Sequence, residues 1–177
     1  MLDLGCGAGR HALFFQSLGH DVTAVDVSPG AIDVCRARGV TDARLQDLAT
    51  PPTDSRWMTI LLMCGNFGLA GDWHGTRALL TDLASIAGPS AVLIADSVDP
   101  SLMADEYSTL HRRRNEAAGR HVGHARLRLR YEGTVTPWWD LLNVPVAEVP
   151  PLVAETGWEV ELHITGGLDH YMVLRKL

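Results

Sequence analysis

The chain has 177 residues, of which 46% are hydrophobic and 20% are charged, and its formal net charge is −6 at pH 7. This size and apolar content suit one globular domain over residues 1–177, and the acidic balance makes nucleic acid an unlikely partner. No apolar run reaches the ~18 residues of a membrane span, and no basic-then-apolar leader opens the sequence. We therefore expect a cytoplasmic protein that does not contact a membrane.

The first expected element is a short apolar strand that runs directly into a glycine-rich turn. Leu2 to Leu4 precede Gly5, Gly7 and Gly9, and a helical pattern follows over residues 9–18. Glycine allows backbone dihedrals that a side chain disfavours, and its missing Cβ lets a ligand approach the peptide groups closely. A glycine turn alone is a weak signal, because such turns also serve simply to reverse the chain.

A second apolar strand over residues 22–26 ends in an acid. Asp26 lies 21 residues after Gly5, which matches the roughly 20-residue spacing of a carboxylate that binds ribose. We expect Asp26 to accept hydrogen bonds from both ribose hydroxyls of a nucleoside. The glycines are spaced GxGxG and are followed by Arg10, whereas a dinucleotide site has GxGxxG, so the spacing disfavours NAD.

At this point the sequence resembles the class I S-adenosylmethionine-dependent methyltransferases. LDLGCGAG at residues 2–9 resembles their first motif, AVDVSPGAI at residues 24–32 the second, and ARLQDL at residues 43–48 the third. The resemblance implies S-adenosylmethionine as the cofactor and S-adenosylhomocysteine as the product. It implies these cofactor-binding residues: Asp3, Gly5, Cys6, Gly7, Gly9, Asp26, Val27, Asp47, Leu48 and Cys64.

The resemblance also assigns roles within that set. Asp3 is expected to orient the methionyl end of the cofactor, although a solvated strand residue is the alternative. Asp47 or its neighbour Leu48 is expected to contact the adenine amino group. In the fourth motif, the apolar strand over residues 58–63 is followed by Cys64, where many relatives place an acid. The sequence therefore identifies no catalytic carboxylate at this position.

Strands and helices alternate along the chain. Expected strands cover residues 2–5, 22–26, 42–46, 58–63 and 91–96, with helices near 9–18, 29–38 and 75–87. Later, residues 146–156 suggest a helix, and 158–164 and 171–174 resemble the family's antiparallel sixth and seventh strands. We predict an α/β, Rossmann-like doubly wound fold: a mostly parallel seven-stranded sheet with an antiparallel last strand, in a three-layer sandwich.

Residues 97–145 match no motif and hold seven of the fifteen basic residues: Arg112, Arg113, Arg114, Arg120, Arg126, Arg128 and Arg130. We expect this insertion to cover the active site and hold the acceptor, which is anionic if the arginines bind it. Alternation of the last three arginines with Leu127, Leu129 and Tyr131 favours a half-buried strand instead. Trp138 and Trp139 suit either a flat substrate or the core, and we expect at least one in the core.

Chemistry follows from the donor, because a sulfonium methyl is already activated and in-line displacement mainly requires alignment of the acceptor. A hydroxyl acceptor also needs a base, for which His11 and His111 are weak candidates, with Asn66 as a positioning group. Asp96 and His170 are further candidates. We expect a small-molecule acceptor, and the alternatives are a non-catalytic binding module or a methyltransferase that acts on RNA.

Two further features concern the cysteines and the start of the sequence. Cys6, Cys35 and Cys64 show no CxxC spacing, so neither a disulfide framework nor a metal site is expected, and reduced thiols suit the cytoplasm. Cys35 is expected to pack in a helix. Relatives usually carry helices before the first motif, whereas residue 1 already lies at the first strand. We therefore expect a shortened start and a reduced affinity for the cofactor.

Overall fold

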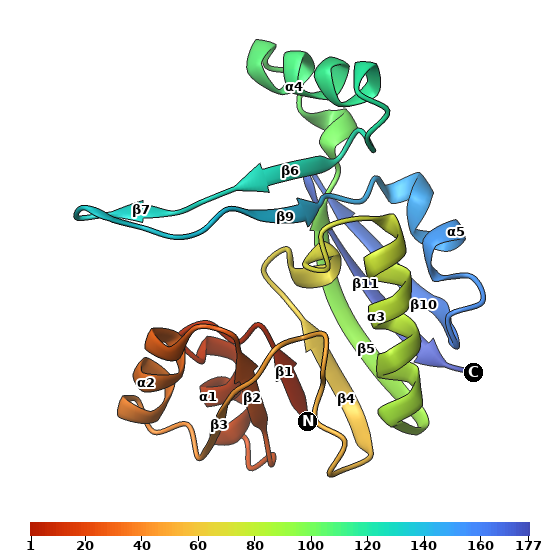
Figure 1. Ribbon diagram of the computed structural model, residues 1–177. Coiled ribbons are helices and arrows are strands. Elements are labelled where there is room, and N and C mark those ends of the chain that lie inside the picture. The colour runs from red at the N-terminus through yellow and green to blue at the C-terminus, as the bar shows by residue number, and fades with distance from the viewer.

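A computed structural model describes residues 1–177 as a seven-stranded sheet with helices on its faces (Figure 1). The strands are β1 (Leu2–Leu4), β2 (Thr23–Asp26), β3 (Asp42–Leu45), β4 (Trp57–Leu62), β5 (Ala87–Val98), β10 (Trp158–Gly166) and β11 (Asp169–Lys176). Their order is β10-β11-β5-β4-β1-β2-β3. Strands β1 to β5 pair in parallel, and β11 is antiparallel to both of its neighbours. The predicted sheet with an antiparallel last strand is confirmed.

The core forms two clusters, one on each face of the sheet. Helices α3 (Trp73–Ile86) and α5 (Val149–Val153) contribute to a cluster of 24 buried residues. On the opposite face, α1 (Arg10–Ser17) and α2 (Pro29–Ala37) enclose a cluster of 8. Adjacent residues of a strand point to opposite faces, so Val25 joins the first cluster and Ala24 the second. The predicted three-layer arrangement is confirmed, and Cys35 packs in the core as expected.

Polar side chains start the helices where the sequence changes from loop to amphipathic pattern. Ser28 Oγ accepts a hydrogen bond from Ala31 N, and Pro29 occupies the first turn of α2. Asp72 Oδ1 accepts from Gly75 N at 2.7 Å at the start of α3. Each cap satisfies an amide that has no partner within its own helix, which fixes the helix boundary.

The helix expected over residues 146–156 is wrong in extent. The segment forms a short 3-10 turn, η3 (Val146–Glu148), followed by α5, which ends at Val153. Pro150 and Pro151 lie in the first turn of α5 and donate no backbone hydrogen bonds, and Glu155 has a φ of 64°. This left-handed residue ends any helical continuation before Gly157.

Residues 97–145 form a separate unit at the carboxyl edge of the sheet. It contains η2 (Pro100–Leu102), α4 (Glu106–Ala117), β6 (His124–Leu127), β7 (Arg130–Tyr131), β8 (Thr134–Val135) and β9 (Trp139–Leu142). Strands β6 and β9 pair antiparallel, as do β7 and β8 nearer the tip. We call residues 124–142 the arm, which projects away from the sheet (Figure 1).

The expected half-buried strand in the arm is wrong. Leu129 is 66% exposed and Tyr131 is 74% exposed, because the outer arm is a two-stranded ribbon with no second layer against it. Trp138 is 52% exposed, and Arg128 stacks on its ring at 4.5 Å. Trp139 is also only partly buried, so neither tryptophan belongs to the core.

Buried polar groups fasten the return of the arm to the sheet. Ser97 Oγ accepts from Val144 N at 3.0 Å, and Asp99 Oδ2 accepts from Val146 N at 3.0 Å. The Nε2 atom of His170 lies 2.8 Å from Val144 O, so this ring nitrogen donates to the carbonyl. His170, a candidate base from the sequence, is therefore buried and engaged in holding the arm.

None of the helices combines the length and the apolarity needed to cross a lipid bilayer.

A glycine below the arm provides a test of this attachment. A Cβ added at Gly68 lies 1.8 Å from Leu142 O, a backbone atom of β9 that has no room to move. We expect Gly68→Ala to lower the free energy of unfolding by about 3 kcal/mol, measured by urea denaturation. Gly30→Ala is the matched control, because its nearest atom is 4.0 Å away, and it changes stability by less than about 1 kcal/mol. Equal effects of the two variants contradict the packing described here.

Candidate cofactor site

The glycine turn begins where β1 ends, at the carboxyl edge of the parallel strands. Gly5 N and Cys6 N both donate to Val25 O, at 2.9 and 3.0 Å, so the turn is tied to the end of β2. All three glycines of the turn have positive φ, between 53° at Gly7 and 75° at Gly9. This left-handed region favours glycine, which explains the repeated residue at alternate positions.

The three glycines differ in what surrounds them. A Cβ at Gly5 meets Asn66 Nδ2 at 2.4 Å, and a Cβ at Gly9 meets Cys35 Sγ at 2.9 Å. A Cβ at Gly7 meets nothing within 4 Å. Gly5 and Gly9 therefore allow close packing within the protein, whereas Gly7 presents bare backbone to open space. This is the arrangement needed for a ligand that lies against the turn.

Asp26 lies at the end of β2 and is held in place by the backbone. Its Oδ2 accepts from Gly7 N at 2.9 Å, and its Oδ1 accepts from Ser28 N at 2.8 Å. Each oxygen keeps a further lone pair for a ligand. Val27 beside it is 68% exposed and offers apolar surface at the same edge.

Further along this edge, Asp47 and Leu48 follow the end of β3. Asp47 Oδ1 accepts from Ala49 N at 3.0 Å, and Leu48 packs against the larger core cluster. Since β1, β2 and β3 are parallel neighbours, their carboxyl ends bring these two residues to the same edge as the glycine turn. The structure thus brings the strand-end members of the expected cofactor set together.

Asp3 differs from the other acids because it is buried below the turn. It is 1% exposed, and its Oδ2 has no hydrogen-bond partner. Burial raises the pKa of Asp3 above its usual value, and the nearby His11 and the backbone of Ala12 oppose that shift. A buried carboxylate oxygen without a donor costs free energy, and a cationic group removes that cost. The residues of the site therefore fit a ligand with an ammonium group, such as a methionyl end.

The loop after β4 closes the site from the other side. Asn66 Nδ2 donates to Leu4 O at 3.1 Å and to Gly5 O at 2.9 Å, so Asn66 positions the glycine turn. Both oxygens of Asp96 accept from Gly65 N at 3.1 Å. Cys64 is exposed, has a φ of 67°, and its Sγ lies 2.9 Å from a guanidinium nitrogen of Arg10.

The weak catalytic candidates do not converge. His11 lies near Asp3 in the first turn of α1. His111 lies on α4, where its Nε2 is 2.9 Å from His124 O and its ring stacks on Tyr107. Asn66 is engaged with the glycine turn. These positions identify no general base.

The sequence missed two histidine–carboxylate pairs at the base of the arm. His124 Nε2 lies 3.0 Å from Asp140 Oδ1, and His121 Nε2 lies 2.5 Å from Glu148 Oε2. The first pair forms across β6 and β9, so it depends on a strand register that residue spacing does not reveal. No group of three or more His, Cys, Asp or Glu side chains has a geometry that could hold a metal ion.

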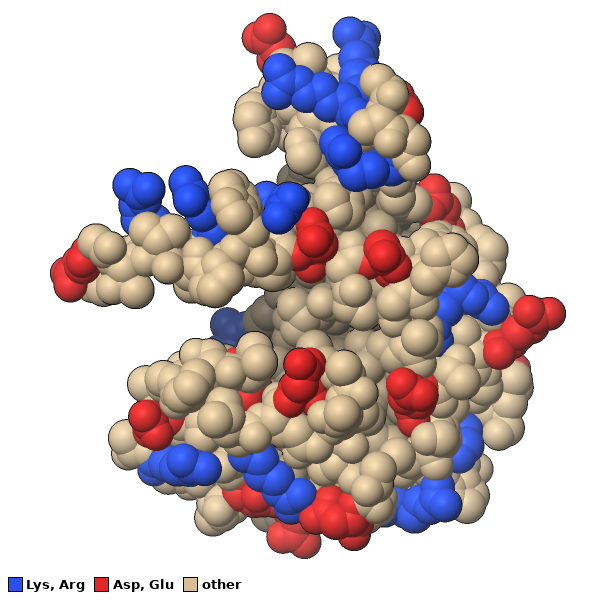
Figure 2. Space-filling model, in the orientation of Figure 1, with Lys and Arg blue, Asp and Glu red and all other residues tan.

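A cleft separates the arm from the part of the molecule that carries the glycine turn (Figure 2). The basic residues of the arm are Arg126, Arg128 and Arg130, and Figure 2 shows basic side chains along the outer side of the arm. The side toward the cleft is mostly uncharged in this view. A second hollow, of about 180 Å³, lies between α4 and β6 and includes Tyr107, His111 and Leu127.

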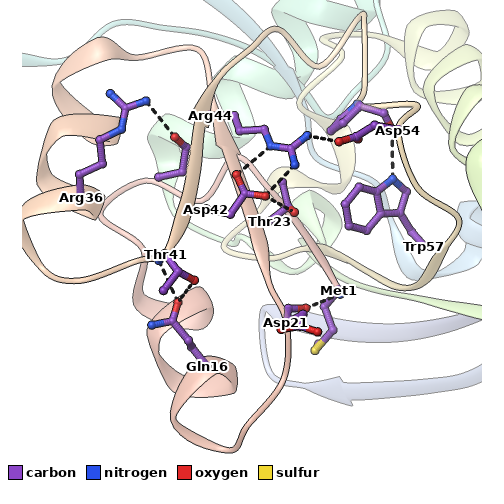
Figure 3. A network of polar contacts seen from close by, with 12 residues as sticks. Met1, Gln16, Asp21, Thr23, Arg36, Thr41, Asp42, Arg44, Asp54 and Trp57 are labelled. Atoms are coloured by element: carbon purple, nitrogen blue, oxygen red, sulfur yellow. Dashed lines mark hydrogen bonds and ion pairs between the residues drawn. The ribbon is translucent and has the colours of Figure 1, made fainter.

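A larger hollow, of about 430 Å³, lies at the opposite, amino edge of the sheet. Its polar groups are already paired with one another (Figure 3). Arg44 binds Asp42 at 2.7 Å and Asp54 at 2.8 Å, and Thr23 donates to Asp42 at 2.7 Å. The hydrogen bond from Arg44 lowers the pKa of Asp42. Because these charges already have partners, we assign the site to the carboxyl edge, where Asp3 lacks one.

Comparison with known proteins agrees with this site. A family model described as a methyltransferase domain matches residues 1–90, just over half of the chain. The chain therefore belongs to this methyltransferase family. The predicted membership of the class I S-adenosylmethionine-dependent methyltransferases is confirmed, and with it the enzyme class and the methyl donor that defines the class.

Solved structures share the whole fold. An S-adenosylmethionine-dependent methyltransferase from Bacteroides fragilis, in complex with S-adenosylhomocysteine, is 26% identical with a TM-score of 0.80, covering 99% of this chain and 71% of that one. A methyltransferase from Methanosarcina mazei is 15% identical with a TM-score of 0.80, over 99% and 91%. The amino pentose methyltransferase CalS10 from Micromonospora echinaspora is 16% identical with a TM-score of 0.72, over 99% and 82%. The last two show the fold alone.

A match to a curated protein is short. Hemagglutinin 1 of Eikenella corrodens is 61% identical over 31 residues, which are 18% of this chain and 10% of that protein. The chain spans about a tenth of that relative's length, so the match carries no statement about activity.

The unpaired Asp3 leads to a prediction about stability. Because burial raises its pKa in the folded state, Asp3 destabilises the ligand-free protein at pH values above that pKa, and the cost disappears below the ordinary value of 3.8. We expect Asp3→Asn to raise the free energy of unfolding at pH 7 by about 1 kcal/mol. The gain should shrink as the pH is lowered, as measured by urea denaturation at several pH values.

Asp42→Asn is the matched control with the opposite sign. The pKa of Asp42 is lowered by its bond to Arg44, so its ionised form stabilises the protein above 3.8 and that stability is lost as the pH falls. The control variant should be less stable than the wild type at pH 7. A loss of stability in Asp3→Asn as well would mean that the Asp3 carboxylate already has a partner in the ligand-free protein.

Proposed function

We propose that the protein transfers the methyl group of S-adenosylmethionine to a small-molecule acceptor held in the cleft between the glycine turn and the arm. The observation that carries the proposal is the unpaired Asp3 oxygen below an open Gly7, beside the ordered carboxylate of Asp26. In this proposal Asp26 accepts from the ribose hydroxyls, and Asp3 faces the ammonium group. The remaining contacts come from Gly5, Cys6, Gly7, Gly9, Val27, Asp47, Leu48 and Cys64.

The chain's part in the reaction is to bind, orient and exclude water. When bound, S-adenosylmethionine supplies a methyl group on a positively charged sulfur, which is already activated for displacement. The hydrogen bonds at Asp26 and Asn66 hold the turn in one geometry, which fixes the position of the reacting carbon. The arm limits the access of water to the cleft. An amine acceptor that reaches the cleft unprotonated needs no base from the protein, which agrees with the lack of a convergent base.

The acceptor is proposed to be a small molecule that contacts residues 97–145. Fold neighbours include an amino pentose methyltransferase, which supports an acceptor of that size. The basic side chains of the arm lie away from the cleft in Figure 2, so they give no support to an anionic acceptor. A cytoplasmic location stays a prediction from the sequence.

RNA methylation and a non-catalytic binding role are the other candidate functions. The net charge of −6 disfavours a polyanionic substrate, and a binding module would take up the cofactor without transferring methyl groups. Incubation with a methyl-labelled donor separates them, because small amines such as amino sugars become labelled under the proposal. Labelling of RNA alone, or of nothing in a broad acceptor screen, contradicts it.

Cofactor binding is tested by thermal unfolding with S-adenosylhomocysteine and with NAD. A ligand at 100 times its dissociation constant stabilises a protein by about 2.7 kcal/mol, so only S-adenosylhomocysteine should raise the melting temperature. Asp26→Ala should weaken its binding by about 1.5–3 kcal/mol, because charged hydrogen bonds to the ribose are lost.

Asp33→Ala is the control for Asp26→Ala, since Asp33 lies on the outer side of α2 with its side chain 77% exposed. It should leave binding unchanged. Stabilisation by NAD alone would reverse the assignment of the cofactor.

A further inference from the structure

Arg10 differs from the other arginines of residues 1–99. Five of these, Arg36, Arg38, Arg44, Arg56 and Arg77, each donate to at least one carbonyl or carboxylate oxygen. The exposed guanidinium of Arg10 donates only to Cys64 Sγ, at 2.9 Å, and it has no ion pair. A thiol is a weak, neutral acceptor, so the charge of Arg10 remains without a counter-ion.

The position of this charge is electrostatically costly. Arg10 is the first residue of α1, and the first turn of that helix contains no acid and no side-chain cap. The amino end of a helix carries a partial positive charge, which disfavours a cation and favours an anion. An unpaired cation and free helix amides therefore stand together at the end of the glycine turn, where they suit an anionic group.

The residue that faces Arg10 explains why its charge is free. Cys64 is exposed and has a φ of 67°, a left-handed conformation that Asp and Asn tolerate better than most residues. A carboxylate at this position would pair with the guanidinium 2.9 Å away. The thiol leaves the guanidinium available.

Arg10 and Asp3 flank the same helix start with opposite charges. The Asp3 carboxylate interacts with the backbone of Ala12, two residues beyond Arg10, and its Oδ2 has no donor. One unpaired anion and one unpaired cation within a single turn match an amino acid, which carries an ammonium and a carboxylate on one carbon. The two groups are complementary to a zwitterion.

We propose that Arg10 binds the carboxylate of the methionyl part of the cofactor, while Asp3 binds its ammonium group, and that Cys64 keeps Arg10 free for this role. The inference rests on the proposed function and adds a binding residue to the same site. It assigns to Cys64 a role through its neutrality rather than through any reaction of its thiol.

The test measures dissociation constants by calorimetry for S-adenosylhomocysteine and for its decarboxylated analogue, which keeps the adenosine, the thioether and the amine. Arg10→Ala should weaken binding of S-adenosylhomocysteine about tenfold and leave the analogue unchanged. Arg38→Ala is the control, because Arg38 donates to Ala8 O in the turn itself. It should change the two constants by the same factor.

A second pair of variants tests the role of Cys64. Cys64→Asp should form an ion pair with Arg10 and weaken S-adenosylhomocysteine several-fold without weakening the decarboxylated analogue. Cys64→Asn has the same shape and the same tolerance of a left-handed backbone but no charge, so it should bind both ligands as the wild type does. Circular dichroism checks that each variant is folded.

The outcomes separate this inference from the proposed function. If the wild type binds neither ligand, the proposed function fails. If the wild type binds S-adenosylhomocysteine and Arg10→Ala weakens both ligands equally or neither, the inference is overturned while the proposed function stands. An effect of Arg10→Ala on acceptor affinity alone would assign the guanidinium to the acceptor and would also overturn it.

Discussion

The bond between the glycine turn and the end of β2 is the constraint on which the site depends. Gly7 N donates to Asp26, and Gly5 N and Cys6 N donate to Val25 O. These contacts join two strand ends that lie far apart in the sequence and fix both the open backbone and the carboxylate. A turn without side chains has little structure of its own, so its shape comes from these hydrogen bonds and from Asn66 on the opposite side.

The site stores uncompensated charge in the ligand-free protein. Asp3 is buried without a donor, and Arg10 is exposed without an oxygen acceptor, whereas Arg44 at the opposite edge is fully paired. Leaving the two groups unpaired reduces stability, and a ligand of complementary charge recovers that free energy on binding. The contrast between the two edges of one sheet is the physical basis for assigning binding to one and structure to the other.

The sequence predicted the cofactor half well because its signals are local. The glycine turn and Asp26 sit within 26 residues, and their roles depend on backbone conformation and on strand ends. Residues 97–145 were predicted poorly. Alternation around Arg128 is the pattern of a half-buried strand, but the ribbon has no covering layer, and Leu129 is exposed on it. Likewise, the His124–Asp140 pair arises from strand register, which no spacing along the chain encodes.

The central claim is that the carboxyl edge beside Gly7 holds the adenosyl group of the methyl donor. A crystal structure of the complex with S-adenosylhomocysteine tests it most directly. The account predicts ribose hydroxyls within hydrogen-bond distance of Asp26 and the amino-acid end between Asp3 and Arg10. Density for the ligand in the hollow around Arg44, or in the pocket between α4 and β6, would contradict it.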